Sequence, residues 1–463
     1  MRLREQVISF GGVIILALSL PVLLKLLNSV TRIFVGAEGR LAAIAVETDH
    51  PLGPLPQPWR ALAQGGEALP TFLDNTAPQV QATHPNYIRI DHIYDEFNVV
   101  SRQGGQLHYN WTELDKVVDK MQAVGAKPFL SLSYMPLAIS SGDVVAEPND
   151  YNDWAQVVQK TIERYSGDKG IQDVYYEVWN EPDLFGKWTM GGKKDYKKLY
   201  VFASRGATAA QGVKPFKLGG PATTGLYKNW LDSFFPFVLN NRLRLDFFSW
   251  HRYDLDVDKY TQDVANVEAW LDSHPYFANV EKIVTEMGPS SDKAAVNESL
   301  IGAAHLIATA RELMFKVSYG INFSVKDAPG STGGWGLITA AGAVKPRYQA
   351  LTLLSQLGDK RLGLTGEGSW VRAIAAEDGT TYQVLVVNYD PRSTHSEIVP
   401  VSFINLTPGT FTLKQSILGA RSVTEQISTT SAVLQREVSL TPNSAVLLEL
   451  SPTATSSAQP PVR

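Results

Sequence analysis

The residues of this chain that could do chemistry gather at the end of one apolar run. Tyr175 to Val178 is largely aromatic and β-branched, which suits a strand buried on both faces of a parallel sheet. Trp179-Asn180-Glu181-Pro182 follows, and because Pro182 cannot donate to a sheet ladder, we expect the strand to end with Glu181 at its mouth. A carboxyl group beside an indole is partly desolvated and can hold a proton near neutral pH. An amide such as that of Asn180 offers both donors and acceptors to a sugar hydroxyl.

A second carboxylate ends another predicted strand. Ile283-Val284-Thr285 has the pattern of a buried strand, and Glu286 follows it shortly before Gly288. In our count Glu181 ends strand four and Glu286 strand seven, which face each other across the mouth of an eight-stranded barrel. Hydrolysis of a glycoside needs two such groups, one to protonate the leaving oxygen and one to face the anomeric carbon. We expect their carboxyl groups to lie about 5–5.5 Å apart, the separation of retaining enzymes, whereas a gap above about 6.5 Å would indicate inversion.

Predicted strands and helices alternate from residue 59 to residue 357. Counting from Trp59, eight strands are each followed by a helix or by room for one, the pattern of an α/β fold of the (β/α)8 TIM barrel type. The first unit is the weakest, because residues 71–84 make a poor helix. This segment is the predicted catalytic domain.

On both sides of this segment the alternation of predicted strands and helices stops. Short strands separated by Gly, Asp, Pro and Asn turns predict a C-terminal β-sandwich over residues 358–451. Residues 37–58 combine a short strand around Ile44, which we expect to return to the sandwich, with a proline-rich linker. Residues 452–463 form a tail of Ser, Pro and Ala that we expect to be disordered.

The first 36 residues contain an apolar segment. Residues 7–27 carry one charge, at Lys25, and Arg2 and Arg4 precede them. The run meets the lower end of the spanning range of about 17–25 residues and lacks a good cleavage site, so it favours an N-terminal transmembrane signal-anchor. The arginines would then be cytoplasmic, and the protein would sit in the cell membrane with its catalytic domain outside the cytoplasm. Secretion after cleavage is the alternative.

Composition excludes several classes of function. The 463-residue chain has a net charge of −4 and no basic block, so nothing favours nucleic-acid binding. It has no Cys, which rules out disulfides, thiolate metal sites and a catalytic thiol. The eight His residues show no metal-ligand spacing, and we expect neither a metal nor a cofactor. The sequence leaves the oligomeric state open.

Over about residues 51–358 the chain resembles family 39 of the retaining glycoside hydrolases, the β-xylosidase and α-iduronidase family of clan A. The resemblance is carried by Trp179-Asn180-Glu181-Pro182 with Glu286 three strands later, together with Arg89, Tyr134-Met135-Pro136, Gly219-Gly220-Pro221, Asp246 to Ser249 with His251, and Trp335-Gly336-Leu337. It implies Glu181 as general acid/base, Glu286 as nucleophile and Asn180 as ligand of the 2-hydroxyl. It also implies that His251 and Tyr253 lie beside the nucleophile and that Arg89 holds its charge. The full set of expected substrate-binding residues is Asn180, Arg89, Asp91, His92, Trp179, His251, Tyr253, Phe323, Lys326 and Trp335.

Several positions depart from the family pattern. The family usually has a His where this chain has Asp91, a Trp platform where it has Phe323, and small residues where it has Lys326 and Arg252. These changes leave the sugar open. Lys326 and Arg252 either bind a uronic acid carboxylate or pair with Asp327 and Asp254.

The sequence therefore predicts a β-xylosidase-like retaining hydrolase of an oligo- or polysaccharide that works by double displacement through a covalent glycosyl-enzyme. Two alternatives stay open: an endo-acting hydrolase of an envelope or extracellular polysaccharide, and a non-catalytic carbohydrate-binding envelope protein. Trp179, Phe185, Trp188, Tyr253 and Trp335 are candidates for stacking on sugar faces, with core packing as the alternative for each.

Overall fold

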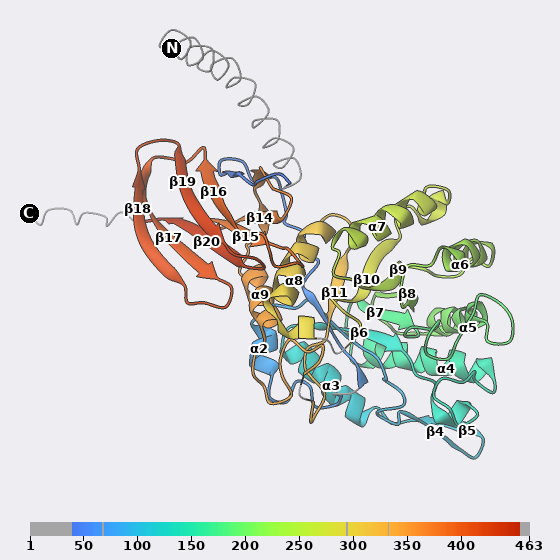
Figure 1. Ribbon diagram of the computed structural model, residues 1–463. Coiled ribbons are helices and arrows are strands. Elements are labelled where there is room, and N and C mark those ends of the chain that lie inside the picture. The colour runs from blue at the N-terminus through green and yellow to red at the C-terminus, as the bar shows by residue number, and fades with distance from the viewer. Residues whose placement is uncertain (1–38, 67–68, 293–294, 332, 454–463) are drawn as a thin grey trace, which may run out of the picture.

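The apolar segments predicted as strands pair in parallel and close into a barrel (Figure 1). The computed structural model describes residues 39–66, 69–292, 295–331 and 333–453. Around the barrel the strand order is β10-β11-β2-β3-β6-β7-β8-β9. The strands are β2 (Ala61–Gln64), β3 (Tyr87–Ile90), β6 (Lys127–Leu132), β7 (Val174–Val178), β8 (Phe216–Thr223), β9 (Phe247–Tyr253), β10 (Glu281–Gly288) and β11 (Tyr319–Phe323).

Helices between the strands surround this barrel. They are α2 (Ala77–Gln81), α3 (Thr112–Ala123), α4 (Tyr151–Ile162), α5 (Tyr196–Ala209), α6 (Lys228–Asn240), α7 (Asp258–Leu271), α8 (Leu300–Leu313) and α9 (Pro346–Ser355). Local sequence sets several of their starts: the carboxylates of Asp150 and Asp195 accept from backbone N–H groups at the starts of α4 and α5, and Pro346 begins α9. A hairpin of β4 (Val100–Gln103) and β5 (Gln106–Tyr109) precedes α3. The first unit has only the short helix α2, where the sequence predicts a poor one.

The inside of the barrel is filled in layers. Near the N-terminal ends of the strands, Tyr87, Phe129, Tyr175 and Phe247 form a buried aromatic cluster with Ile283. The rings of Phe129 and Tyr175 stack with 4.9 Å between their centroids. The barrel is thus a packed core, and its C-terminal end is left for polar residues.

Two sheets form the domain after the barrel. One has the order β13-β1-β16-β19 and the other β12-β14-β15-β20-β17-β18. The strand β1 (Ile44–Glu47), which precedes the barrel, lies between β13 and β16. The C-terminal strands are β12 (Lys360–Arg361), β13 (Gly363–Thr365), β14 (Val371–Asp378), β15 (Thr381–Asn388), β16 (Glu397–Ile404), β17 (Gly409–Ile417), β18 (Val423–Thr429), β19 (Val433–Leu440) and β20 (Ala445–Pro452).

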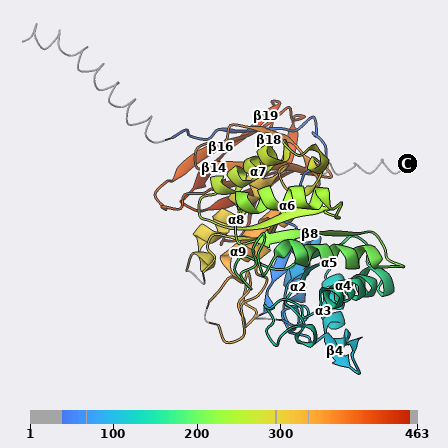
Figure 2. The same ribbon diagram turned by 90° about the vertical axis from the view of Figure 1, so that its right-hand side faces the viewer.

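The sandwich lies beside the α8 and α9 side of the barrel (Figures 1 and 2). Arg311 on α8 pairs with Glu367 at 2.7 Å, and Arg372 on β14 pairs with Glu312 at 2.8 Å. The Tyr389 hydroxyl donates to the carbonyl oxygen of Leu255 in the loop after β9. These contacts join the sandwich to the barrel.

Among the described residues, no helix has both the length and the apolar character needed to cross a membrane. The predicted anchor at residues 7–27 and most of the predicted tail at 452–463 lie outside the described residues. The membrane location therefore stays a prediction from sequence.

Candidate active site

The end of β7 has an unusual backbone. Trp179 has φ +78° and Glu181 has φ +45°, both in the left-handed region that side chains with a Cβ rarely adopt. The hydroxyl of Ser131 donates to the Trp179 carbonyl at 2.9 Å, and the Glu181 N–H donates to the carbonyl of Ala222 at 3.0 Å. The neighbouring strands β6 and β8 thereby hold the turn that presents Glu181.

The two predicted carboxylates meet at the mouth of the barrel. Glu181, Glu286 and His251 each place one oxygen or nitrogen atom within 4.8 Å of those of the other two. His251 Nδ1 lies 2.8 Å from Glu181 Oε1 and 3.6 Å from Glu286 Oε2. His251 stands next to Glu286 because β9 and β10 pair in register there, just past an irregularity after Val284.

A buried arginine organises the floor of the site. The guanidinium of Arg89 donates from Nε to Glu177 at 2.7 Å, from Nη1 to Glu286 at 2.9 Å and from Nη2 to the Asn180 carbonyl oxygen at 2.7 Å. The Asn180 amide then donates to the Tyr134 hydroxyl at 3.1 Å. The planar fork of an arginine fixes all three partners at once, so one side chain aligns the nucleophile candidate with the amide beside the acid candidate.

Glu286 receives a further donor. The Tyr253 hydroxyl donates to Glu286 Oε2 at 2.8 Å. Burial, with the Glu286 charge adding to it, raises the pKa of Tyr253, so its hydroxyl remains neutral and available as a donor. The two oxygens of Glu286 are thus each held by one hydrogen bond, from Arg89 and from Tyr253.

Burial and charge act against each other in this cluster. Burial raises the pKa of Glu286 and the charge of Glu181 adds to it, whereas His251 and Arg89 lower it. Burial by itself lowers the pKa of His251, but Glu286 and the hydrogen bond with Glu181 outweigh it, and the net pKa of His251 is raised. Burial also opposes the charge of Arg89, yet Glu177 and Glu286 raise its pKa, so the guanidinium is permanently charged. The floor of the site therefore combines one fixed cation with a carboxyl group and an imidazole whose pKa values are both raised.

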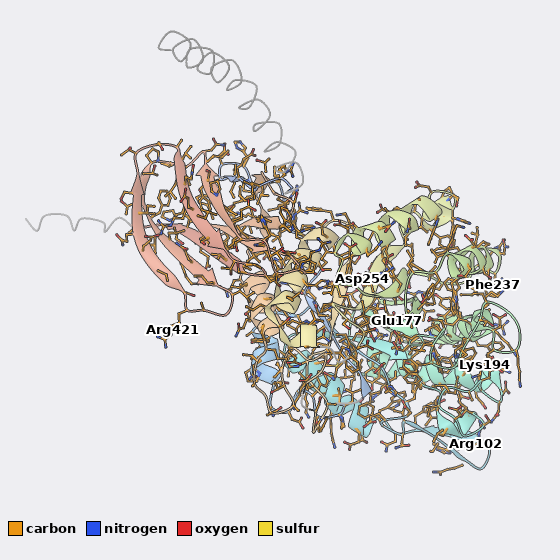
Figure 3. The ribbon with its side chains drawn as sticks, in the orientation of Figure 1. Arg102, Glu177, Lys194, Phe237, Asp254 and Arg421 are labelled. Atoms are coloured by element: carbon orange, nitrogen blue, oxygen red, sulfur yellow. The ribbon has the colours of Figure 1, made fainter. Side chains whose placement is uncertain are left out.

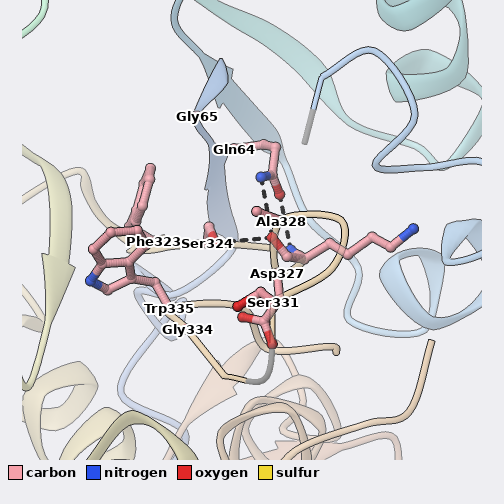
Figure 4. Close-up of a pocket in the computed structure, with 10 residues that line it drawn as sticks. Gln64, Gly65, Phe323, Ser324, Asp327, Ala328, Ser331, Gly334 and Trp335 are labelled. Atoms are coloured by element: carbon pink, nitrogen blue, oxygen red, sulfur yellow. Dashed lines mark hydrogen bonds between the residues drawn. The ribbon is translucent and has the colours of Figure 1, made fainter. Parts of the chain in front are cut away.

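Above this floor is a cavity of about 680 Å³. A volume in this range accommodates a ligand larger than a single small group. Its lining residues include Gly65, Gly66, Asp91, His92, Tyr134, Asn180, Glu181, Asp183, Leu184, Phe185, Thr224, Arg252, Tyr253, Glu286, Asp292, Phe323 and Trp335. A second, much smaller cavity of about 20 Å³ adjoins it, with Phe323 and Trp335 together on one side and Gln64 on the other (Figure 4).

Ten of the twelve site residues predicted from sequence lie in this cavity or its floor. Eight of them line the cavity, and Arg89 and His251 lie buried in the floor through their bonds to Glu286 and Glu181. The eight are Asp91, His92, Asn180, Glu181, Tyr253, Glu286, Phe323 and Trp335. Their roles in binding stay predictions.

The structure places the other two elsewhere. Trp179 is fully buried, its ring packs against Tyr134 and Trp188, and its indole N–H donates to the Phe185 carbonyl, so it does not offer a face to a sugar. The left-handed turn at Trp179 is the physical reason. The ammonium of Lys326 donates to the Asn75 side chain at 2.7 Å, outside the large cavity.

The expected ion pairs of the two unusual cations also differ. Arg252 lines the cavity but makes two hydrogen bonds of 2.6 Å to Asp263 on α7, and Asp254 is not its partner. Asp327 pairs with Lys345 at 2.5 Å, and Lys326 is not its partner. Of the stacking candidates, Trp188 is buried, whereas Phe185 is 41% exposed at the cavity wall.

Sequence reasoning missed two residues of the floor. Glu177 lies fully buried within the barrel (Figure 3) and anchors Arg89. A charged residue inside the otherwise apolar run from Tyr175 to Val178 is the signal that points to it. The sequence singles out Tyr134 only as part of the Tyr134-Met135-Pro136 motif, and no pattern indicates its hydrogen bond with Asn180.

Three of these groups have the spacing of cation ligands. The ligand atoms of Glu181, His251 and Glu286 are close enough to share an ion. Glu181 Oε1, His251 Nδ1 and both oxygens of Glu286 already take part in hydrogen bonds among themselves or with Arg89 and Tyr253. The arrangement can do acid–base and nucleophilic chemistry.

Comparison with known proteins finds similar sequences. The sequence profile of Glycosyl hydrolases family 39 matches residues 42–385. A beta-xylosidase of Geobacillus stearothermophilus is 29% identical over 298 residues, which cover 56% of this chain and 58% of that protein. A beta-xylosidase of Caldicellulosiruptor saccharolyticus is 27% identical over 308 residues, which cover 59% and 62%. Both matches span less than two thirds of the relatives' own length.

Solved structures share the fold. The GH39 enzyme from Xanthomonas axonopodis pv. citri superimposes with a TM-score of 0.78 at 21% identity, covering 89% of this chain and 98% of that one. A monomeric beta-xylosidase from Caulobacter crescentus CB15 gives 0.77 at 21% identity, covering 89% and 100%.

Proposed function

The chain belongs to family 39 of the glycosyl hydrolases, and from this premise we propose that it hydrolyses β-glycosidic bonds of a β-xylosidase-like substrate with retention of anomeric configuration. The observation that carries the proposal is that one carboxylate oxygen of Glu181 lies within 4.8 Å of one of Glu286, at the floor of the large cavity. Retaining enzymes hold their carboxyl groups about 5–5.5 Å apart, whereas inverting enzymes need about 6.5–9.5 Å to seat a water molecule between them. The short approach supports the retaining route.

Hydrogen bonds support a division of roles between the two acids. Glu286 accepts from the Arg89 guanidinium and the Tyr253 hydroxyl, while Glu181 contacts only His251 among these polar groups. Donors favour the ionised form of a carboxyl group, which supports Glu286 as the nucleophile and leaves the acid/base role to Glu181.

The reaction then runs in two steps. Glu181 gives its proton to the glycosidic oxygen as a Glu286 oxygen bonds to the anomeric carbon. The bond from that carbon to the leaving group breaks, and the product is a covalent glycosyl-enzyme. Glu181, now ionised, removes a proton from a water molecule that attacks the same carbon and releases Glu286. The Asn180 amide, fixed by Arg89 and Tyr134, faces the cavity to bind the hydroxyl next to that carbon.

Replacement of the two acids tests the proposal. We expect Glu286→Gln to lower kcat on aryl β-xylosides about ten-thousand-fold or more. We expect Glu181→Gln to lower it about 100- to 10,000-fold, least for the best leaving groups because these need no proton. Glu113→Gln on the exposed side of α3 serves as the matched control. Full activity in both site variants would show that the acids do not carry the reaction.

The stereochemical outcome tests retention separately. Proton NMR of the first sugar released from a β-glycoside distinguishes the anomers before they interconvert. We expect the β anomer; the α anomer would show an inverting enzyme. A protein that binds sugars in the Glu286→Gln and wild-type forms alike, without turnover in either, would be the carbohydrate-binding alternative.

Anchoring in the cell membrane through residues 7–27 is part of the proposal, on sequence grounds alone. We expect the full chain to stay with the membrane fraction after high-salt washing and its catalytic domain to be accessible from outside the cytoplasm. Release of the activity into the medium would indicate cleavage instead.

A further inference from the structure

The large cavity has two opposite walls. Glu181, Leu184, Phe185 and Thr224 follow β7 and β8, while Gly65 and Gly66 follow β2 and Phe323 ends β11, the strands across the barrel. Asp91 and His92 follow β3, the neighbour of β2, and extend this second wall. An acid that protonates the leaving oxygen must stand on the side of the leaving group. The wall with Asp91 therefore faces the sugar whose anomeric carbon reacts.

Asp91 is the unusual residue of this wall. It is 5% exposed and lines the cavity, and its Oδ1 has no hydrogen-bond partner among the described residues. Two nearby groups bond to other partners: His92 Nδ1 with Asp95 at 2.8 Å, and the Arg89 nitrogens with Glu177, Glu286 and Asn180. A buried carboxyl oxygen without a donor is costly, and nearly all such groups find a partner. The missing donor is expected from the ligand.

The space beside this oxygen is kept open by a glycine. A Cβ at Gly65 would lie 3.7 Å from Asp91 Oδ1 and 3.0 Å from the ring of Phe323. Any larger side chain would fill the volume in front of the carboxylate. Gly65 therefore leaves room for a ligand group to approach Asp91.

The charges of the cavity restrict that group further. Five acids line it: Asp91, Glu181, Asp183, Glu286 and Asp292. The guanidinium of Arg252 is bonded to Asp263, and the ammonium of Lys326 to Asn75. A sugar carboxylate would be repelled by the ionised members of this set, and Arg252 and Lys326 are each bonded to another side chain.

We propose that Asp91 determines sugar specificity by accepting a hydrogen bond from a hydroxyl or ammonium group of the reacting sugar, and that the cavity takes neutral or cationic sugars and rejects uronic acids. The inference rests on the proposed glycoside hydrolysis and deepens it. It assigns a binding role to the position where this chain departs from the usual family residue.

The test combines variants with substrates that lack single groups. We would measure kcat/KM of the wild type, Asp91→Ala and Asp91→Asn on a series of 4-nitrophenyl glycosides. The series comprises the β-D-xyloside, the β-D-glucoside, the 3-, 4- and 6-deoxy forms of the β-D-glucoside, the 2-amino-2-deoxy-β-D-glucoside and the β-D-glucuronide. Glu96→Gln, an exposed acid in the same loop, is the matched control for loss of one charge. Thermal unfolding of each variant reports whether it is folded.

We expect Asp91→Ala to lose roughly 10- to 100-fold in kcat/KM on the preferred glycoside, the range for a hydrogen bond to a charged group. For the deoxy substrate that lacks the contacted hydroxyl, kcat/KM should be the same in Asp91→Ala as in the wild type. If the donor is an ammonium group, Asp91→Asn should also have a lower kcat/KM on the amino glycoside. Glucuronide should be the poorest substrate of the wild type.

An equal loss on every substrate, or none beyond that of Glu96→Gln, would overturn the inference while leaving the hydrolase intact. A wild-type preference for glucuronide would do the same. If the wild type turns over no substrate, calorimetry with Glu286→Gln decides. Glycoside binding that Asp91→Ala does not weaken in that background overturns the role of Asp91, and absence of all binding overturns the proposed function with it.

Discussion

Along β7 the inward side chains change character within two residues. Tyr175 belongs to the aromatic cluster at the N-terminal end of the barrel, stacked on Phe129, whereas Glu177, about 7 Å further along the strand, holds Arg89 beneath the candidate catalytic acids. The lower layer is apolar and gains free energy from its burial. The upper layer buries charges that stay favourable only while every partner is present. The comparison indicates that the same strands serve stability at one end of the barrel and reactivity at the other.

Removing the central cation should have the largest effect on the upper layer. In Arg89→Met the carboxylates of Glu177 and Glu286 lose their fixed partner, which should destabilise the fold by about 3–5 kcal/mol. The pKa of Glu286, already raised by burial, should rise further. Because the nucleophile must be ionised, the acid limb of kcat/KM should move to higher pH, and activity near neutral pH should fall about 100-fold or more. Urea unfolding and a pH–rate profile measure the two effects.

A double variant separates the effect on stability from the effect on activity. Glu177→Met with Arg89→Met replaces a buried pair by apolar side chains, so part of the stability should return. Activity should not return, because Glu286 and Asn180 remain without their donor. Recovery of both would mean that Arg89 serves only the fold.

The lower layer should show the opposite pattern. Phe129→Ala removes a fully buried ring in contact with Tyr175 and Phe247, and should lower the free energy of unfolding by about 3–5 kcal/mol. At temperatures where the variant is folded, KM and the pH profile should match those of the wild type. A shift in the pH profile would show that the two layers are coupled.

A smaller change in the upper layer should affect rate more than stability. Tyr253→Phe removes the hydroxyl that donates to Glu286 at 2.8 Å. Loss of a donor to the ionised carboxylate should reduce kcat/KM roughly tenfold and again move the acid limb to higher pH. Tyr276→Phe, at an exposed tyrosine, is the control. An unchanged acid limb would argue that Glu286 does not set it.

The smallest effect should come from Lys326→Met. Its ammonium is bonded to Asn75 outside the large cavity, so kcat/KM on neutral and anionic glycosides should stay within about twofold of the wild type. A selective loss on β-D-glucuronide would place Lys326 at the substrate after all.

The convergence of Glu181 and Glu286 was predictable because it depends only on the order of strands in a barrel. Once the sheet closes into a barrel, an acid at the C-terminal end of a buried strand lies at the mouth of the barrel. The aromatic lower layer and the helices around it follow from hydrophobic pattern in the same way. In the sandwich, the apolar runs at residues 370–374, 382–387, 411–413 and 445–448 predict four strands, which correspond to β14, β15, β17 and β20 in one sheet.

The sequence does not predict the directions of side chains outside regular strands. Lys326 lies three residues beyond the end of β11, where the alternation of a strand no longer applies. Trp179 turns into the core because its backbone is left-handed, which no propensity predicts. The sequence does not single out β19, whose exposed face is largely polar, or β16, which has Pro400 within it.

The position of β1 has a consequence for synthesis of the protein. On a ribosome this strand emerges roughly 300 residues before β13 and β16, between which it finally lies. At a synthesis rate of about 5–20 residues per second, both edges of β1 remain unpaired for about 15–60 s while the intervening domain is made. Its length of four residues limits the template it offers to other nascent chains during that interval.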